Sequence, residues 1–302
     1  MYTLAKRNVY ASTIAEFLNA QLIGDDVIIT HPTTYSDMVE HSISMFEAGI
    51  QQFPDVKNIL ILVEKAMDID RPGISQIVSD NPRLDYFRIV NEFYIENIGQ
   101  GIHESAVVEE GACIGRNIFV DKGSFISKDS VLSNNIKIMK NVILNGKISI
   151  GNNSIVKYGS VIGSEGYSFV LDEDNIPIHF PQIGGVRIGK NVWIGSNTTI
   201  EKGFLGETVL GDNVKIDDLV HIGGNCQIGS STMITSGVVI AVNSTIGDNC
   251  WLAPNSSISN DIVIGKNVTI GMGAVVLKDC ESNGVYVGNP AKLIKMKESP
   301  KK

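Results

Sequence analysis

An aliphatic residue returns at every sixth position through most of the chain beyond residue 101, and this period constrains the fold more than any other feature. The first run of these positions is Ile102, Val108, Ile114, Val120, Ile126, Leu132, Ile138, Leu144, Ile150, Val156 and Ile162. The second run is Ile188, Ile194 and Ile200, followed after a four-residue slip by Leu210, Ile216, Ile222, Ile228, Ile234, Ile240, Ile246, Leu252, Ile258, Ile264, Ile270 and Val276. A period of six matches neither the 3.6-residue period of an amphipathic helix nor the alternation of a hairpin. It is typical of a parallel β-helix.

The hexapeptide repeat predicts a triangular prism. Three hexapeptides form one coil, and each contributes a short strand to one flat face, with its aliphatic side chain pointing inward. The residue four positions later must be small to fit near a corner, as Ala112, Cys226 and Ser244 are. Gly often follows the aliphatic residue and Asn comes soon after, which suits turns with positive φ. We therefore predict a β-class fold, a left-handed parallel β-helix over residues 101–281, followed by a C-terminal extension at 282–302.

Two interruptions of the period are expected to carry function. Residues 164–187 form an excursion between two coils, and it is rich in polar and aromatic side chains. The four-residue slip lies within residues 201–209 and forms a second, smaller bulge. A solenoid accepts such loops on one face, and that face is often the binding one. A tolerated insertion without function is the alternative.

Residues 1–100 lack the six-residue period and predict a small α+β domain. A capped helix is expected to begin at Ser12, and buried strands are expected at Ile59–Val63 and Ile74–Val78. An amphipathic helix is expected over Pro82–Tyr94, with its apolar face formed by Leu84, Phe87, Val90 and Phe93. We expect this domain to recognise a nucleotide base, with Tyr35 as an aromatic platform and Phe46 packed in the core.

Composition excludes several classes of protein. The net charge of −8 argues against a nucleic-acid surface. No apolar run approaches the length of a bilayer span, and the N-terminus lacks the pattern of a signal peptide. The four cysteines show no CxxC pairing, so we expect buried thiols in a reducing cytoplasm. Only one histidine, His221, lies within regular coils, so we expect no metal centre built from converging histidines.

Beyond the repeat, the chain to about residue 290 resembles the UDP-3-O-acylglucosamine N-acyltransferases of the lipid A pathway. The residues that carry the resemblance are Asp80–Leu84, Gly101–His103, Val161–Tyr167, Phe180–Gly184, Asn197–Ile200 and Val214–Val220. Hexapeptide repeats alone would not reproduce the excursion loop. The resemblance implies a homotrimer, active sites in the clefts between neighbouring prisms, and acyl transfer to a sugar amine.

The chain also departs from that family. Gly224 stands where the family's catalytic histidine is expected, and a second family histidine would fall near Asp261. The run Val285–Lys292 is similar to hexapeptide acyltransferases that use coenzyme A, and the long C-terminal helix that the family uses with acyl carrier protein is missing. The nearest resemblance is to N-acyltransferases of dTDP-linked amino-dideoxysugars in surface glycan synthesis, including the anthrose-pathway type that transfers a hydroxyacyl group such as 3-hydroxybutyryl. The alternatives are an acyl carrier protein-dependent UDP-sugar N-acyltransferase and a non-catalytic scaffold.

Amide formation from a thioester needs a neutral amine, a stabilised oxyanion and a group that removes one proton. His221 is the leading base, because it precedes the inward Ile222 and therefore points outward from a flat face. His179 is the second candidate for the base, although a substrate-binding or structural role is favoured for it. Asn225 is assigned to orient the amine or the oxyanion, with a turn residue of the repeat as the alternative. A solvent-facing or subunit-interface histidine is the alternative for His221, in which case water or the substrate accepts the proton. His103 is expected to be structural.

The remaining site residues are assigned to substrate and donor. The residues expected to bind the nucleotide-linked amino sugar are Glu165, Tyr167, His179, Phe180, Gln182, Asp217 and Tyr35. The residues expected to bind coenzyme A along the C-terminal coils are Gly271, Gly273, Ala274, Lys278, Gly288 and Lys292. In this assignment the small residues leave a groove, and the lysines meet the phosphates. Asp217, with its neighbour Asp218, is alternatively a solvated corner charge.

Overall fold

The computed structural model describes residues 3–5, 7–46, 55–69, 71–96 and 99–297. The chain forms two compact units, Met1–Ile98 and Gly99–Lys302. The boundary between them in the sequence is two residues earlier than the predicted one, which follows residue 100. The charged end of the predicted C-terminal extension, residues 298–302, lies outside the described residues.

The N-terminal unit is built on a five-stranded sheet. In spatial order its strands are β3 (Leu22–Ile23), β8 (Ile74–Val78), β7 (Ile59–Val63), β6 (Ser42–Met45) and β5 (His31–Pro32). β3 runs antiparallel to β8, and the other neighbours are parallel. The two predicted strands, β7 and β8, have the expected bounds and lie at the centre of the sheet, where six of their residues are fully buried.

Short elements complete this unit. They are β1 (Thr3–Leu4), β2 (Val9–Tyr10), α1 (Ala11–Phe17), β4 (Ile28–Ile29), a 3₁₀ turn (Tyr35–Asp37), α2 (Pro82–Ile89), a π-helical turn (Val90–Tyr94) and β9 (Ile95–Glu96). β1 pairs with β9 and β2 with β4, both antiparallel.

Two details of the predicted helices are wrong. Ser12 is not an N-cap: α1 already begins at Ala11, and the Ser12 backbone N–H and hydroxyl both donate to the carboxylate of Asp26, at 2.8 and 2.9 Å. The second error is the buried face of α2. Leu84 and Phe87 are 44% and 49% exposed, whereas the buried residues of this segment are Pro82, Ile89 and Tyr94. The helix turns its Pro82 side toward the sheet, and the π-helical turn at Val90–Tyr94 then changes the spacing that a regular helix would keep.

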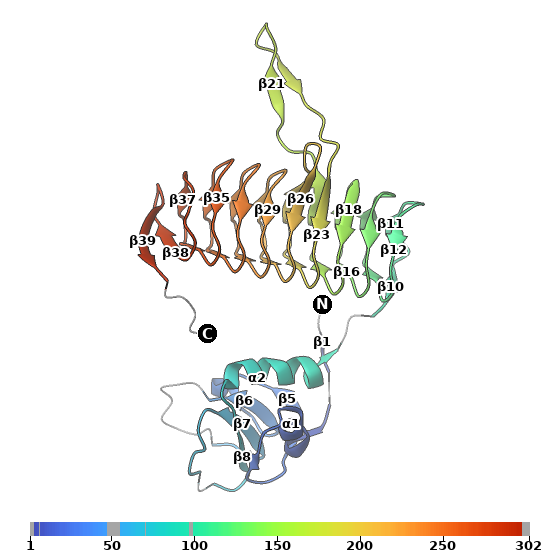
Figure 1. Ribbon diagram of the computed structural model, residues 1–302. Coiled ribbons are helices and arrows are strands. Elements are labelled where there is room, and N and C mark those ends of the chain that lie inside the picture. Colours follow the sequence, from blue (N-terminus) through green and yellow to red (C-terminus); the bar gives the residue numbers. More distant parts are fainter. Residues whose placement is uncertain (1–2, 6, 47–54, 70, 97–98, 298–302) are drawn as a thin grey trace. The chain divides into compact units, whose positions relative to one another are not determined.

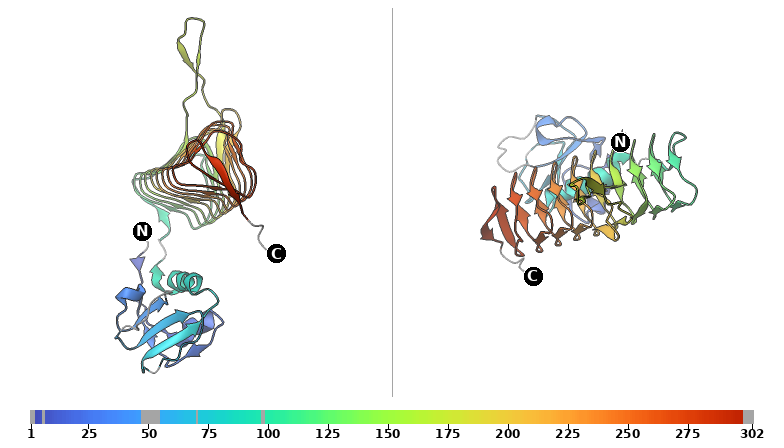
Figure 2. Two further views of the ribbon diagram at one scale, coloured as in Figure 1. Left: turned by 90° about the vertical axis from the view of Figure 1, so that its left-hand side faces the viewer. Right: turned by 90° about the horizontal axis from the view of Figure 1, so that it is seen from above.

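The second unit is a left-handed parallel β-helix, as the hexapeptide repeat predicts, and it has a triangular cross-section when viewed along its axis (Figure 2). Face 1 contains β10 (Gly101–Ile102), β13 (Phe119–Val120), β16 (Lys137–Ile138), β19 (Ile155–Val156), β24 (Trp193–Ile194), β27 (Lys215–Ile216), β30 (Met233–Ile234), β33 (Trp251–Leu252), β36 (Thr269–Ile270), β38 (Gly284–Val287) and β39 (Lys292–Met296). Face 2 contains β11 (Val107–Val108), β14 (Phe125–Ile126), β17 (Ile143–Leu144), β20 (Val161–Ser164), β25 (Thr199–Glu201), β28 (His221–Ile222), β31 (Val239–Ile240), β34 (Ser257–Ile258) and β37 (Val275–Val276). Face 3 contains β12 (Cys113–Ile114), β15 (Val131–Leu132), β18 (Lys147–Ile150), β23 (Gly185–Ile188), β26 (Glu207–Leu210), β29 (Gln227–Ile228), β32 (Thr245–Ile246) and β35 (Val263–Ile264).

The aliphatic ladder fills the prism. From Val120 onward the six-residue positions are 0–3% exposed and form one continuous core. Before Val120 the ladder is less well buried. Ile102 is 48% exposed, because it lies on β10, the terminal strand of face 1, where no further strand covers it. At the corners, asparagines take positive φ, for example 59° at Asn135, and their amides stack from coil to coil. The Nδ2 of Asn117 donates to the Oδ1 of Asn135 at 2.9 Å, in the next coil.

The excursion at 164–187 becomes a β-hairpin that projects away from the coils (Figure 1). Its strands are β21 (Phe169–Leu171) and β22 (Pro177–His179). At the other end of the unit, the residues predicted as an extension contribute strands to face 1: β38 pairs in parallel with β36, and β39 pairs antiparallel with β38.

Three of the four cysteines are buried, as expected, but Cys113 is exposed because it points outward from β12. Within the described residues, no helix has both the length and the apolar character needed to cross a bilayer.

Candidate active site

His221 lies on face 2 and points away from the core. It pairs with Thr199 in the preceding coil and Val239 in the next, while its neighbour Ile222 is fully buried inside the prism. The imidazole is 41% exposed. Alternation along a two-residue strand therefore places it on the outer surface, where a substrate can reach it.

A buried carboxylate lies beside this histidine. Glu201 is the last residue of β25, and its side chain is only 9% exposed. Its Oε2 accepts a hydrogen bond from the backbone N–H of Gly224 at 3.0 Å, and its Oε1 lies 3.5 Å from His221 Nε2. Glu201 and His221 come from neighbouring strands of face 2 and point to the same side, which makes them a diagonal cross-strand pair.

Two glycines shape the space around Glu201. A Cβ on Gly166 would lie 2.1 Å from Glu201 Oε2, so the root of the excursion packs directly on the carboxylate. A Cβ on Gly224 would lie 2.7 Å from the carbonyl oxygen of Lys202. The position where the resemblance places a catalytic histidine therefore has no room for a side chain unless the backbone at Lys202 moves.

Charged side chains join the excursion to the bulge after β25. Glu165 accepts both contacts: its Oε1 is 3.2 Å from Lys202 Nζ, and its Oε2 is 3.4 Å from His179 Nε2. Gln182 is 2% exposed, and its Oε1 accepts from the backbone N–H of Gly166 at 2.9 Å. Glu165 and His179 are thus brought together near Lys202, whereas Gln182 supports the loop from within.

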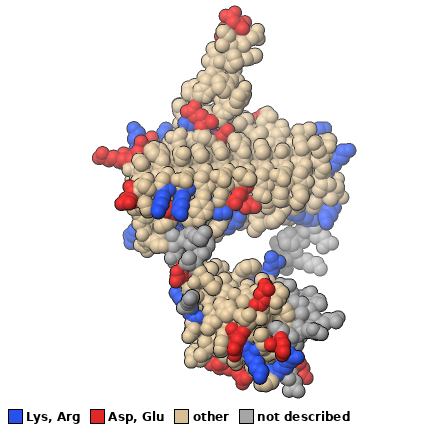
Figure 3. Space-filling model, turned by 180° about the vertical axis from the view of Figure 1, so that it is seen from behind, with Lys and Arg blue, Asp and Glu red and all other residues tan. Residues whose placement is uncertain are grey.

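The hairpin itself is mostly apolar. Tyr167 is 89% exposed and stacks at a tilt on Phe169, whose ring in turn lies 5.2 Å from that of His179. Phe180 lies edge-on to Phe204, which belongs to the bulge. Apart from Glu165 at its root, the acidic side chains of the excursion lie in the hairpin turn at 172–175, visible as the acidic tip in Figure 3. The predicted substrate-binding aromatic residues therefore lie on a protruding, largely uncharged surface.

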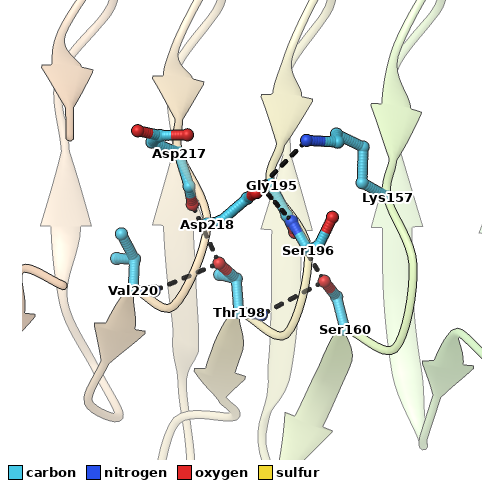
Figure 4. Close-up of polar contacts among 8 residues, drawn as sticks. All are labelled: Lys157, Ser160, Gly195, Ser196, Thr198, Asp217, Asp218 and Val220. Carbon is cyan, nitrogen blue, oxygen red and sulfur yellow. Dashed lines mark hydrogen bonds and ion pairs between the residues drawn. The ribbon is translucent and has the colours of Figure 1, made fainter. Parts of the chain in front are cut away.

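Asp217 and Asp218 lie at the corner between β27 and β28 (Figure 4). Asp218 Oδ1 accepts from Lys157 Nζ at 2.9 Å and from the Ser196 backbone N–H at 2.6 Å. Burial raises the pKa of Asp218, but these hydrogen bonds lower it by more, so the net shift is downward. Asp217 is exposed, and the structure gives its carboxylate no hydrogen bond within the described residues.

Asn225 is a turn residue. Its φ is 61°, its Oδ1 accepts from the Phe204 backbone N–H, and its Nδ2 donates to Asn243 Oδ1, both at 2.9 Å. Its amide oxygen and nitrogen are thus both engaged within the corner ladder. These two bonds hold the amide within the corner and leave one N–H of Nδ2 and one lone pair of Oδ1 for any further contact.

The predicted donor-binding residues gather at the last coils, with one that cannot line a groove. Ala274 is fully buried, because it occupies the small inward corner position. Gly271 and Gly273 flank the exposed Met272, and Lys278 and Lys292 are exposed. The carbonyl oxygen of Gly288 accepts from the Val275 backbone N–H at 3.0 Å.

Tyr35 lies in the other unit and is 5% exposed. Its ring is edge-to-face with Phe46 in a packed hydrophobic cluster, and burial raises the pKa of its hydroxyl. A stacking platform needs an exposed ring face, which Tyr35 does not offer.

The described residues contain no group of three or more His, Cys, Asp or Glu placed to hold a metal ion. Burial raises the pKa of the Cys226 thiol to about 12, with a further contribution from the nearby Glu201 carboxylate. A thiol in that state is not a nucleophile, so Cys226 contributes packing rather than chemistry.

Sequence reasoning missed Glu201 and Lys202. The signal was present: on face 2, the residue after the inward aliphatic is small in the neighbouring coils, Gly163 and Gly223, but is Glu at 201. A charged residue between two coils that have Gly at this position, at the start of the four-residue slip, is the signal that was overlooked.

The chain matches the family model for bacterial transferase hexapeptide (six repeats) over residues 207–241 and 243–278. It is 40% identical over 190 residues to a UDP-3-O-acylglucosamine N-acyltransferase of Coxiella burnetii, covering 57% of this chain and 56% of that enzyme. It is 44% identical over 102 residues to a UDP-3-O-acylglucosamine N-acyltransferase of Paraburkholderia phymatum, covering 32% and 28%. The chain thus spans little more than half the length of the curated relatives it matches.

Among solved structures, the UDP-N-acetylglucosamine acyltransferase from Campylobacter jejuni is similar with a TM-score of 0.59 and 26% identity, covering 65% of this chain and 75% of that one. The UDP-N-acetylglucosamine acyltransferase from Bacteroides fragilis has a TM-score of 0.52 and 25% identity, covering 65% and 74%. Over the matched residues the chain is therefore similar to hexapeptide acyltransferases, in agreement with the resemblance to UDP-3-O-acylglucosamine N-acyltransferases.

Proposed function

We propose that this protein is an N-acyltransferase that moves an acyl group from a thioester to the amine of a nucleotide-linked amino sugar. The observation that carries the proposal is the pair formed by exposed His221 and buried Glu201, at the root of the excursion loop. Similarity to enzymes named as N-acyltransferases of a UDP-linked amino sugar supports the reaction class.

In the proposed reaction the amine nitrogen attacks the carbonyl carbon of the thioester, and a C–N bond forms while the carbonyl oxygen takes the negative charge. His221 accepts the proton that the amine loses, a role suited to a neutral imidazole, which has one nitrogen with a free lone pair. Collapse of the oxyanion breaks the C–S bond. The proton then passes from His221 to the departing thiolate, so atoms and charge balance.

The sugar is proposed to bind between His221 and the excursion, where Glu165 and His179 offer polar contacts and Tyr167 an exposed ring. Hydroxyl and amine groups of a sugar need such acceptors and donors, and an aromatic face suits its apolar side. The finer assignment is a dTDP-linked amino-dideoxysugar. A UDP-linked amino sugar is the second candidate, favoured by the 40% identity to enzymes whose name specifies one.

The acyl donor is proposed to be a coenzyme A thioester, with a hydroxyacyl group such as 3-hydroxybutyryl. Lys278 and Lys292 are exposed cations at the last coils, and they can meet the phosphates of such a donor. Acyl carrier protein is the alternative donor. We place the reaction in the cytoplasm, where nucleotide sugars and acyl thioesters are formed.

The active unit is proposed to be a homotrimer, with each site completed by a neighbouring copy. The described hairpin leaves a set of apolar side chains exposed, namely Tyr167, Phe169, Val170, Leu171, Ile176, Ile178, Phe180 and Ile183. A contiguous exposed apolar surface of this kind is characteristic of an interaction site.

A product screen by mass spectrometry tests the function. The purified protein is incubated with a panel of dTDP- and UDP-linked amino sugars, each paired with acetyl-CoA, 3-hydroxybutyryl-CoA and a 3-hydroxyacyl carrier protein. We expect an N-acylated nucleotide sugar from a coenzyme A donor, and at least about ten-fold less of it with His221→Ala. Product formed only from acyl carrier protein, or only from UDP sugars, would reverse the finer assignments. No product in any pairing from a correctly assembled trimer would overturn the enzyme and favour a scaffold.

A further inference from the structure

We infer that Glu201 is a positioning residue for His221: it holds the imidazole with its proton on Nε2 and leaves Nδ1 free to accept the proton of the attacking amine. The inference deepens the proposed function and rests on it, because His221 acts as a base only if the protein carries out the proposed acyl transfer. The orientation of the ring, however, is a property of the free protein and can be measured without any substrate.

The carboxylate of Glu201 is held in a fixed position. Glu201 is 7% exposed, and its Oε2 is anchored by the Gly224 backbone N–H at 3.0 Å. Gly166 leaves the space that this oxygen occupies, because a Cβ there would lie 2.1 Å away. A carboxylate confined on two sides cannot rotate freely, so its second oxygen, Oε1, has a defined direction.

The second carboxylate oxygen of Glu201, Oε1, faces His221. Oε1 lies 3.5 Å from His221 Nε2, and this is the ion-pair contact that the described structure gives Glu201. The adjacent cation, Lys202, instead reaches Glu165 at 3.2 Å. A buried carboxylate without a partner is costly, and an ionised carboxylate only accepts hydrogen bonds. Nε2 facing Oε1 therefore carries the proton.

The position of the proton on the imidazole determines which ring nitrogen can act as the base. A neutral imidazole with hydrogen on Nε2 has its lone pair on Nδ1. The ring is 41% exposed, so the lone pair is available at the surface. The same contact stabilises the imidazolium that forms when the amine proton arrives, because a negative charge already lies beside it. One buried carboxylate thus fixes the ring orientation and favours the charged intermediate.

A purely structural role for Glu201 is the competing explanation, since the Gly224 contact also ties the bulge to the next coil. The substitution Glu201→Gln distinguishes the positioning role from the purely structural role. If the amide oxygen keeps the Gly224 N–H, the amide NH₂ faces His221 Nε2. Nε2 must then accept, so the proton moves to Nδ1. A structural role predicts no such reversal.

The experiment is ¹⁵N NMR of the histidine rings in the full-length protein, with the His221 signals assigned by their loss in His221→Gln. We expect the Nε2–H form of neutral His221 in the wild type and the Nδ1–H form in Glu201→Gln. Glu201→Asp, which keeps acceptors on both oxygens, retains the Nε2–H form. Glu207→Gln is the matched control, because Glu207 also lies on a strand and pairs with a cation, Arg187, on face 3; it leaves the His221 form unchanged.

Kinetics provide the second readout. Glu201→Gln lowers kcat by about 10²-fold, the contribution of a well-placed general base, with the KM of both substrates within about two-fold. The inference is overturned if neutral His221 of the wild type is the Nδ1–H tautomer. It is also overturned if the wild type and Glu201→Gln have the same tautomer of His221. If the variant is poorly folded by circular dichroism, the wild-type and Glu201→Asp forms decide alone. A wild type that shows Nε2–H but transfers no acyl group would sink the proposed function and leave the positioning contact standing.

Discussion

The carboxylate of Glu201 and the imidazole of His221 lie on neighbouring strands of one face of the β-helix, with Oε1 and Nε2 3.5 Å apart. This contact joins the four-residue slip of the repeat to the histidine that a regular coil presents outward. Gly224, which lacks a side chain, supplies the N–H that anchors the other oxygen. The polar centre of the candidate site therefore consists of a buried carboxylate from one coil and a surface imidazole from the next.

Replacing the histidine tests whether the protein supplies the base. His221→Ala is expected to lower turnover at least about ten-fold, since a general base contributes 10²–10⁴-fold where it operates. The side chain is 41% exposed, so folding of the chain should be unaffected. Steady-state kinetics with thermal unfolding as a control check this. Near-normal turnover would assign the proton to water or to the substrate.

Gly166 offers a test of the loop's contact with the carboxylate. In Gly166→Ala the new Cβ lies 2.1 Å from Glu201 Oε2, so the carboxylate must move and its contact with His221 is lost. We expect kcat to fall by about ten-fold or more with little change in melting temperature. Gly206→Ala is the matched control in the neighbouring bulge, because a Cβ there meets nothing within 4 Å. Equal losses in both variants would show that loop flexibility, not the carboxylate, is responsible.

The β-helix was predictable because one physical requirement repeats. Each hexapeptide buries one aliphatic side chain, and positions such as Ile200 and Ile222 identify both the strand and its inward direction. The outward direction of His221 follows from the same alternation. In the N-terminal unit, β7 was predictable for a similar reason, since all five of its residues are buried in the central strand.

The burial of Glu201 was not predictable. Glu201 lies diagonally opposite His221 in the regular register of β25 and β28, but its carboxylate is enclosed by Gly166 of the excursion, and a six-residue period does not specify the path of an excursion. The buried face of α2 was wrong because the helix packs through Pro82 and Ile89 rather than through Leu84 and Phe87, and the π-helical turn at Val90–Tyr94 shifts only the side chains after Ile89. The positive φ of Asn225 agrees with a turn residue, the alternative to its predicted catalytic role.

The hydroxyl ladder at one corner of the prism allows a stability test (Figure 4). Thr198 is fully buried, and its Oγ1 donates to the Asp217 carbonyl at 3.0 Å and accepts from the Val220 N–H at 3.2 Å. Thr198→Val keeps the shape but leaves both backbone groups without their partner. We expect a loss of about 1–3 kcal/mol in the free energy of unfolding, the cost of an unsatisfied buried polar group, measured by denaturant titration.

Thr208→Val is the control for that experiment. Thr208 is equally buried, but its Oγ1 has no hydrogen-bond partner among the described residues. Removing an unsatisfied hydroxyl should leave stability unchanged or raise it. If both variants lose the same free energy, methyl packing rather than hydrogen bonding determines the effect.

The Asp218–Lys157 pair predicts a pH-dependent contribution to stability. The pKa of Asp218 is lowered in the folded protein, because the Lys157 and Ser196 hydrogen bonds outweigh the effect of burial. A depressed folded pKa gives stability that is fully present above the unfolded value of about 3.9 and is lost as pH falls through the folded pKa. Since the carboxyl is 42% exposed, Asp218→Asn should cost only about 0.2–1 kcal/mol at pH 7, and the difference should vanish in acid. Denaturant titrations of wild type and variant between pH 7 and pH 3 measure it, with exposed Asp217→Asn as the neutral control. A deficit that persists at the lowest pH would assign the loss to the Ser196 contact rather than to the charge, because protonation removes the ion pair from the wild type but leaves the geometry of that backbone contact in place.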